Sequence, residues 1–95
     1  MDALQTVVPR ALTELFRNGP MSQGKLDVAW RVAVGEALSR VSQVRLQPDR
    51  SVEVHPADQR WYRELKRASP MILDKLHALL GKTAVIRLVI VQGPR

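Results

Sequence analysis

Residues 43–55 read QVRLQPDRSVEVH, and this stretch decides the class of fold. Apolar side chains occupy alternate positions on both sides of a turn sequence, at Val44, Leu46, Val52 and Val54. Alternation with a period of two is typical of a strand with one buried face, and proline followed by aspartate is typical of a turn. The segment therefore predicts a two-stranded hairpin.

Apolar residues before the hairpin recur at helical spacing instead. Residues 2–18 predict a first helix, in which Asp2 is placed to cap the N-terminus. Pro9 either kinks this helix or marks its true first turn, because proline has no N–H to donate. Residues 23–39 predict a second helix with Gly35 in its interior, where glycine costs about 1 kcal/mol relative to alanine and admits a close-packed neighbour.

Helical spacing returns after the hairpin, over residues 57–80. Its apolar stripe begins at Trp61, which we expect in the core together with Trp30 of the preceding helix. Ser69-Pro70 predicts either a kink or two consecutive helices, the second capped by Ser69. Residues 84–91 then form an apolar run, which predicts a strand buried on most of both faces.

The predicted order of elements is α-α-β-β-α-β, an α+β fold. A strand that follows a long helix favours a right-handed crossover, parallel to an earlier strand. The expected architecture is a three-stranded mixed sheet with helices packed on one face. At 95 residues the chain is expected to be a single domain (1–95), with an N-terminal helix and turn over 1–20 and a core over 23–91.

The composition predicts a cytoplasmic protein with a polyanionic or acidic partner. There is no cysteine, which excludes disulfides, thiolate metal sites and a cysteine nucleophile. No apolar stretch has the length needed to span a membrane, and the N-terminal residues lack the pattern of a signal peptide. Fifteen basic against nine acidic residues give a formal charge of +6, which favours binding to nucleic acid through release of counterions.

Motifs for catalysis are missing from the sequence. No HExxH, GxSxG, GxGxxG or phosphate-loop pattern occurs. His55 and His77 lie far apart, and the acidic residues are scattered with basic residues close by, which favours surface and salt-bridge roles. We therefore expect a protein that is not an enzyme and has no cofactor, no metal site and no small-molecule substrate.

Basic residues suggest where nucleic acid would bind. Arg60, Arg63 and Arg67 align on one ridge of the long helix, opposite its apolar stripe, with Lys66 to one side. Guanidinium groups suit phosphate oxygens, although a solvated charged face is an equally good interpretation. A second basic set lies around the hairpin and consists of Arg40, Arg45 and Arg50. The better candidate for stacking on a base is Tyr62, on the edge of the long helix. If hairpin and helix adjoin, both sets form one groove.

Two segments resemble the DciA family. Residues 30–38, WRVAVGEAL, resemble its tryptophan–valine-glycine–leucine segment, and residues 52–54 followed by 61–65, WYREL, resemble its second signature. The similarity continues to the strand at 85–91 and covers roughly residues 26–91. The resemblance implies a KH-like domain of a bacterial replication protein that helps load the replicative helicase onto single-stranded DNA without being an ATPase itself.

One difference from ordinary KH domains and one departure from the DciA pattern bear on DNA binding. Ordinary KH domains clamp the backbone with a GXXG loop, and the corresponding region here, residues 68–71, reads ASPM. Many family members carry a long basic extension, whereas this chain ends at Gly93-Pro94-Arg95, which predicts a minimal member or one with weaker affinity. Two alternatives remain open: a protein-interaction module without direct nucleic-acid binding, and an RNA-binding domain.

Overall fold

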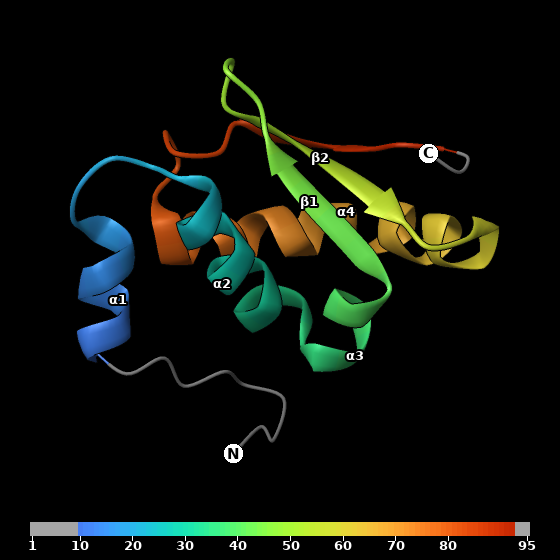
Figure 1. The fold of residues 1–95 in the computed structure, drawn as a ribbon, viewed down its shortest axis with the longest axis horizontal. Coiled ribbons are helices and arrows are strands. Elements are labelled where there is room, and N and C mark those ends of the chain that lie inside the picture. The colour runs from blue at the N-terminus through green and yellow to red at the C-terminus, as the bar shows by residue number, and fades with distance from the viewer. Residues whose placement is uncertain (1–9, 93–95) are drawn as a thin grey trace.

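The computed structural model describes residues 10–92, which form four helices and three strands (Figure 1). In chain order they are α1 (Arg10–Arg17), α2 (Gln23–Val34), α3 (Glu36–Arg40), β1 (Ser42–Leu46), β2 (Ser51–Pro56), α4 (Gln59–Leu80) and β3 (Arg87–Ile90). The predicted first helix is present from Arg10 onward. Asp2 and Pro9, its expected cap and break, lie outside the described residues.

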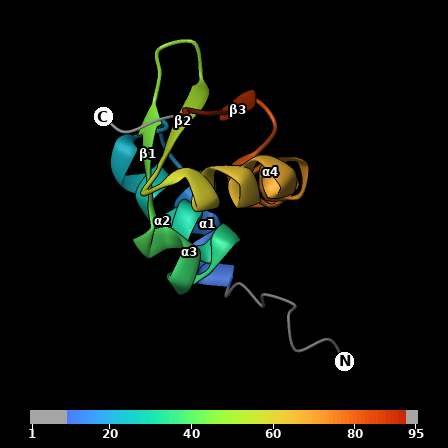
Figure 2. The same cartoon turned by 90° about the vertical axis from the view of Figure 1, so that its right-hand side faces the viewer.

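The three strands form one mixed sheet in the order β1-β2-β3. β1 and β2 pair antiparallel as the predicted hairpin, with Val44 opposite Val54, and β2 and β3 pair parallel, with Val52 opposite Leu88. These four side chains share the face of the sheet that is covered by helices, and Figure 2 shows α3 and α4 on that side of the strands. The predicted α+β class and mixed three-stranded sheet are confirmed.

The core lies between the sheet, α2 and α4. Its largest fully buried side chains come from these three layers and, in the case of Val85, from the segment before β3: Leu26, Leu65, Leu76, Val52, Val54 and Val85. Trp30 is also buried, at 2% exposure, as predicted. Its Nε1 donates to the Ser42 hydroxyl at 3.0 Å, and that hydroxyl donates to the Leu38 carbonyl at 2.7 Å. The indole N–H is therefore satisfied inside the core, and α2 is joined to the first residue of β1.

The single helix predicted over residues 23–39 is wrong, because the chain breaks it at Gly35. This residue has φ 88° and ψ 164°, a conformation that is essentially restricted to glycine. A Cβ at Gly35 would meet no atom within 4 Å, so close packing is not the reason for the glycine. Backbone geometry is the reason: Gly35 separates α2 from α3, which makes the described order α-α-α-β-β-α-β.

Helix α4 runs without interruption through Pro70, which excludes the alternative of two consecutive helices. Proline at position 70 leaves the Lys66 carbonyl without its usual backbone donor four residues later. The Ser69 hydroxyl supplies a replacement by donating to that carbonyl at 3.0 Å. The ends of α4 are as expected, since the Asp58 side chain accepts from the Trp61 N–H at 3.1 Å and Gly81 follows the last residue with φ 99°.

The prediction that residues 84–91 are buried on most of both faces is also wrong. β3 lies at the edge of the sheet, and Val89 is 41% exposed on the face that no described helix covers. Ile86, just before the strand, is 52% exposed. Within residues 10–92, none of the helices has the length and apolar character required to cross a membrane.

Gly35→Ala should destabilise the protein by about 1–3 kcal/mol, because alanine is strained at this backbone conformation. Gly24→Ala is the matched control: Gly24 lies inside α2, where a Cβ has no neighbour closer than 4.0 Å, so alanine should stabilise by up to about 1 kcal/mol. Urea unfolding monitored by circular dichroism measures both changes. Equal effects of the two substitutions would contradict the assigned role of Gly35.

Ser69→Ala should cost about 0.5–1.5 kcal/mol in the native background, because the Lys66 carbonyl loses its donor. In a Pro70→Ala background the cost should fall close to zero, since the alanine N–H takes over that carbonyl. A double-mutant cycle in urea measures this coupling. A Ser69→Ala cost that is the same in both backgrounds would show that the hydroxyl does not compensate for the proline.

Candidate nucleic-acid interface

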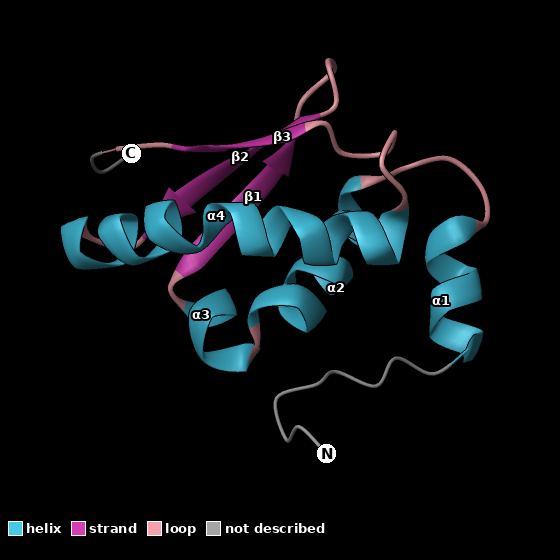
Figure 3. Ribbon diagram, turned by 180° about the vertical axis from the view of Figure 1, so that it is seen from behind, coloured by secondary structure: helices cyan, strands magenta, loops and turns pink. Residues whose placement is uncertain are grey.

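The N-terminal turns of α4 extend beyond the elements that cover the rest of the helix. The buried residues of α4 begin at Leu65, and none lies within residues 59–64. Figure 3 shows this end of α4 reaching past α3 and the ends of β1 and β2. Trp61 is consequently half-buried and not part of the core, so its predicted core position is wrong. It does lie on the apolar stripe, but the elements that pack on this stripe end before reaching it.

Four cations surround this end of α4. Arg60, Arg63, Lys66 and Arg67 are all exposed, as the ridge hypothesis requires. Within the same two turns Glu64 is the one carboxylate, and its Oε2 lies 3.7 Å from Arg67 Nη2. Both side chains are well exposed, at 49% and 76%, and such surface pairs contribute little. The surface therefore keeps a positive potential that suits phosphate groups.

Two aromatic rings lie among these cations. Arg60 Cζ is 5.4 Å from the centroid of the Trp61 ring, and Lys66 Nζ is 6.0 Å from the centroid of the Tyr62 ring. Both distances permit a cation–π interaction, and both rings are half-buried. Partly exposed rings beside cations are the elements that single-strand binding proteins use to stack bases and hold the backbone. We call the six residues 60–63, 66 and 67 the α4 basic surface.

The second basic set does not form one groove with the α4 basic surface. Arg40 lies at the same end of the molecule, because the Ala57 N–H just before α4 donates to Val41 O at 2.9 Å. Arg50 lies at the other end, where its Nη1 donates at 3.1 Å to the carbonyl of Thr83, beyond the C-terminus of α4. A helix of 22 residues separates these ends by about 33 Å.

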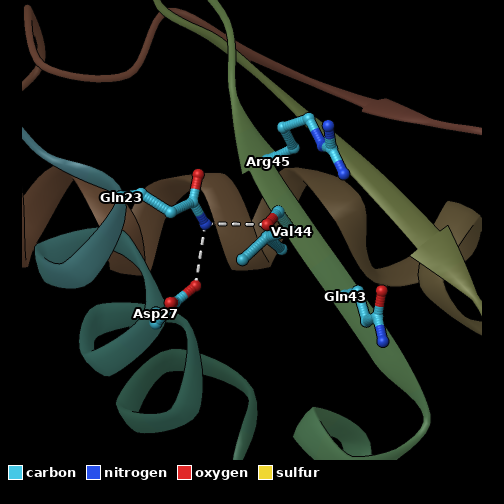
Figure 4. A pocket seen from close by; sticks show the side chains of 5 residues that line it. All are labelled: Gln23, Asp27, Gln43, Val44 and Arg45. Carbon is cyan, nitrogen blue, oxygen red and sulfur yellow. Dashed lines mark hydrogen bonds between the residues drawn. The ribbon is translucent and has the colours of Figure 1, made fainter.

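Arg45 faces away from α4. It alternates with the half-buried Val44, so its side chain lies on the uncovered face of the sheet, opposite Glu53 of β2. There it lines a shallow, open pocket together with residues from β1 and α2: Gln23, Asp27, Gln43 and Val44 (Figure 4). Only Arg40 of the second set is therefore at the same end as the α4 basic surface.

Arg87, which the sequence reasoning missed, lies beside the hairpin turn. Its Nη2 is 3.2 Å from Asp49 Oδ2, so β3 brings a cation to residues far away in sequence. Hydrogen bonds from the Ser51 hydroxyl and backbone N–H to Oδ1 lower the pKa of the Asp49 carboxyl, and Arg87 adds to this effect. Parallel pairing of β3 with β2 explains this contact, because it places residue 87 opposite residue 51.

Both histidines have structural partners. His77 Nε2 lies 2.7 Å from the Val85 carbonyl, which joins α4 to the segment before β3, and His55 Nε2 lies 3.2 Å from Glu53 Oε1. Each ring is half-buried. Across residues 10–92 no group of three or more potential metal-binding side chains was found.

The side chains of the α4 basic surface are the basis for inferring what it binds. Comparison of the chain with models of protein families, with curated proteins and with solved structures found no match. Four cations and two rings on about two helical turns can hold phosphates and stack unpaired bases.

Proposed function

We propose that this protein is a non-enzymatic accessory module that binds single-stranded nucleic acid through the α4 basic surface. The observation that carries the proposal is Trp61, a half-buried indole outside the core with the Arg60 guanidinium 5.4 Å from its ring centroid. An aromatic ring in this environment offers a stacking partner to a base while the neighbouring cations hold phosphates.

Unpaired strands fit this surface better than a duplex. Stacking on Trp61 and Tyr62 needs bases that are not already stacked in a double helix. Arginine and lysine contact phosphates of either form, so they contribute affinity and not the choice between single and double strands. The two rings therefore supply the preference, and the four cations supply most of the binding.

Single-stranded DNA is the proposed nucleic acid, and a replicative helicase is the proposed protein partner. The resemblance of residues 30–38 and 61–65 to the DciA family favours single-stranded DNA, with the replicative helicase as protein partner in the bacterial cytoplasm. RNA uses the same stacking and phosphate chemistry, and is the alternative polymer. A direct comparison of DNA and RNA oligomers of the same sequence distinguishes them.

Arg63→Glu with Arg67→Glu should weaken binding to a labelled single-stranded DNA oligomer by at least about tenfold, a loss of about 1.4 kcal/mol or more. The substitutions remove two cations that neutralise phosphates and introduce two repulsive carboxylates. The slope of log affinity against log salt should also become shallower, by about 0.7 for each phosphate that is no longer neutralised. Fluorescence anisotropy measures both quantities.

Arg31→Glu with Lys75→Glu is the matched control, because both residues are exposed and lie outside the α4 basic surface. Either pair of reversals lowers the formal charge from +6 by four, to +2. The control should retain most of the affinity, since the total charge is matched and only the position differs. Equal losses in the two folded variants would mean that the α4 basic surface is not the binding site.

A further inference from the structure

The two edges of the sheet differ in whether another strand can join them. On the outer edge of β1, Gln23 Nε2 donates to the Val44 carbonyl at 2.8 Å, and the Leu46 N–H donates to Gln23 Oε1 at 2.9 Å. The side-chain amide thus makes the two bonds that a peptide group of a neighbouring strand would make, and Figure 4 shows the bond to Val44. This edge is closed to further pairing.

The outer edge of β3 has no such cover within the described part of the chain. The N–H of Val91 donates to Val54 O at 2.9 Å, toward β2, in agreement with the register that places Ile90 opposite Val54. Directions alternate along a strand, so the N–H groups of Leu88 and Ile90 point to the outer edge. Val89 on this strand and Ile86 just before it are exposed at 41% and 52%, and an apolar, unpaired edge is a template for another strand.

Charge identifies the kind of strand that fits. The start of β3 lies among Arg87, Lys82 and Arg50, all exposed, with Asp49 the acidic residue that pairs with Arg87. Arg50 is held there by its bond to the Thr83 carbonyl. A second copy of this chain carries the same +6 charge and the same basic cluster, so it is disfavoured relative to an acidic partner.

We propose that the β3 edge binds an extended segment of an acidic partner protein as a fourth strand. Antiparallel pairing is the more stable geometry, and it places the C-terminal end of the segment beside Arg87 and Lys82. The segment would carry carboxylates at that end and apolar side chains over Ile86 and Val89. Main-chain hydrogen bonds supply affinity in this mode, and the alternating side chains supply specificity.

The probe is a labelled ten-residue peptide of alternating valine and threonine with two glutamates at its C-terminal end, acetylated and amidated. Anisotropy should give a dissociation constant below about 1 mM. In amide NMR spectra of the protein the largest shifts should fall on residues 86–91. No binding to the full chain at this concentration would overturn the proposal.

Ile90→Pro should weaken peptide binding by at least about tenfold, because it removes an outward N–H that the sheet itself does not use. Ile90→Val is the matched control, since it keeps that N–H and the β-branched shape, and it should change binding less than about threefold. Equal binding by folded Ile90→Pro and by the native chain would overturn strand addition.

Arg87→Glu provides a second test that does not depend on proline. It should reverse the preference of the protein from the glutamate peptide to one in which lysines replace the glutamates. Peptide binding should persist in the Arg63→Glu/Arg67→Glu variant, because the β3 edge is a different surface from that of the proposed function. An unchanged preference, competition by single-stranded DNA, or self-association lost on Ile90→Pro would each contradict the proposed partner.

Discussion

The length of α4 relative to the elements that pack on it is the constraint on which the rest of the structure depends. Its 22 residues extend about 33 Å, whereas β2, the longest strand, has six residues and extends about 20 Å. The sheet, α1 and α2 can bury only the part from Leu65 onward. The first turns are left without a core to join, and there the chain carries four cations and two aromatic rings.

The two ends of the molecule are consequently different in chemistry. At the start of α4, cations lie beside rings, which suits unpaired bases. At the other end, Arg50 and Arg87 lie beside the unpaired edge of β3, which suits an acidic strand. A module with a nucleic-acid surface and a protein surface on opposite ends can hold both partners at once, as the proposed accessory role requires.

Sequence patterns predicted the fold class well, because alternation around Pro48-Asp49 and the stripe from Leu65 to Leu79 reflect local burial. The same patterns failed at positions where contacts between distant elements, or a single residue, decide the local structure. Gly35 breaks a helix whose apolar spacing continues past it, and the hydroxyl of Ser69 keeps α4 intact across Pro70. Trp61 lies on the core stripe but beyond the reach of the sheet. The sequence spacing predicted that four cations gather on one part of α4. Their separation from Arg45 and Arg50 is visible only in the three-dimensional structure.

The most direct test of the central claim is the affinity for labelled single-stranded DNA measured across a salt series, with a duplex of the same sequence alongside. Four phosphates neutralised by the α4 basic surface predict a slope of log affinity against log salt of roughly −3, at about −0.7 per phosphate. Stacking on Trp61 and Tyr62 predicts weaker binding to the duplex. No binding at low salt, or equal binding to both forms, would contradict the account.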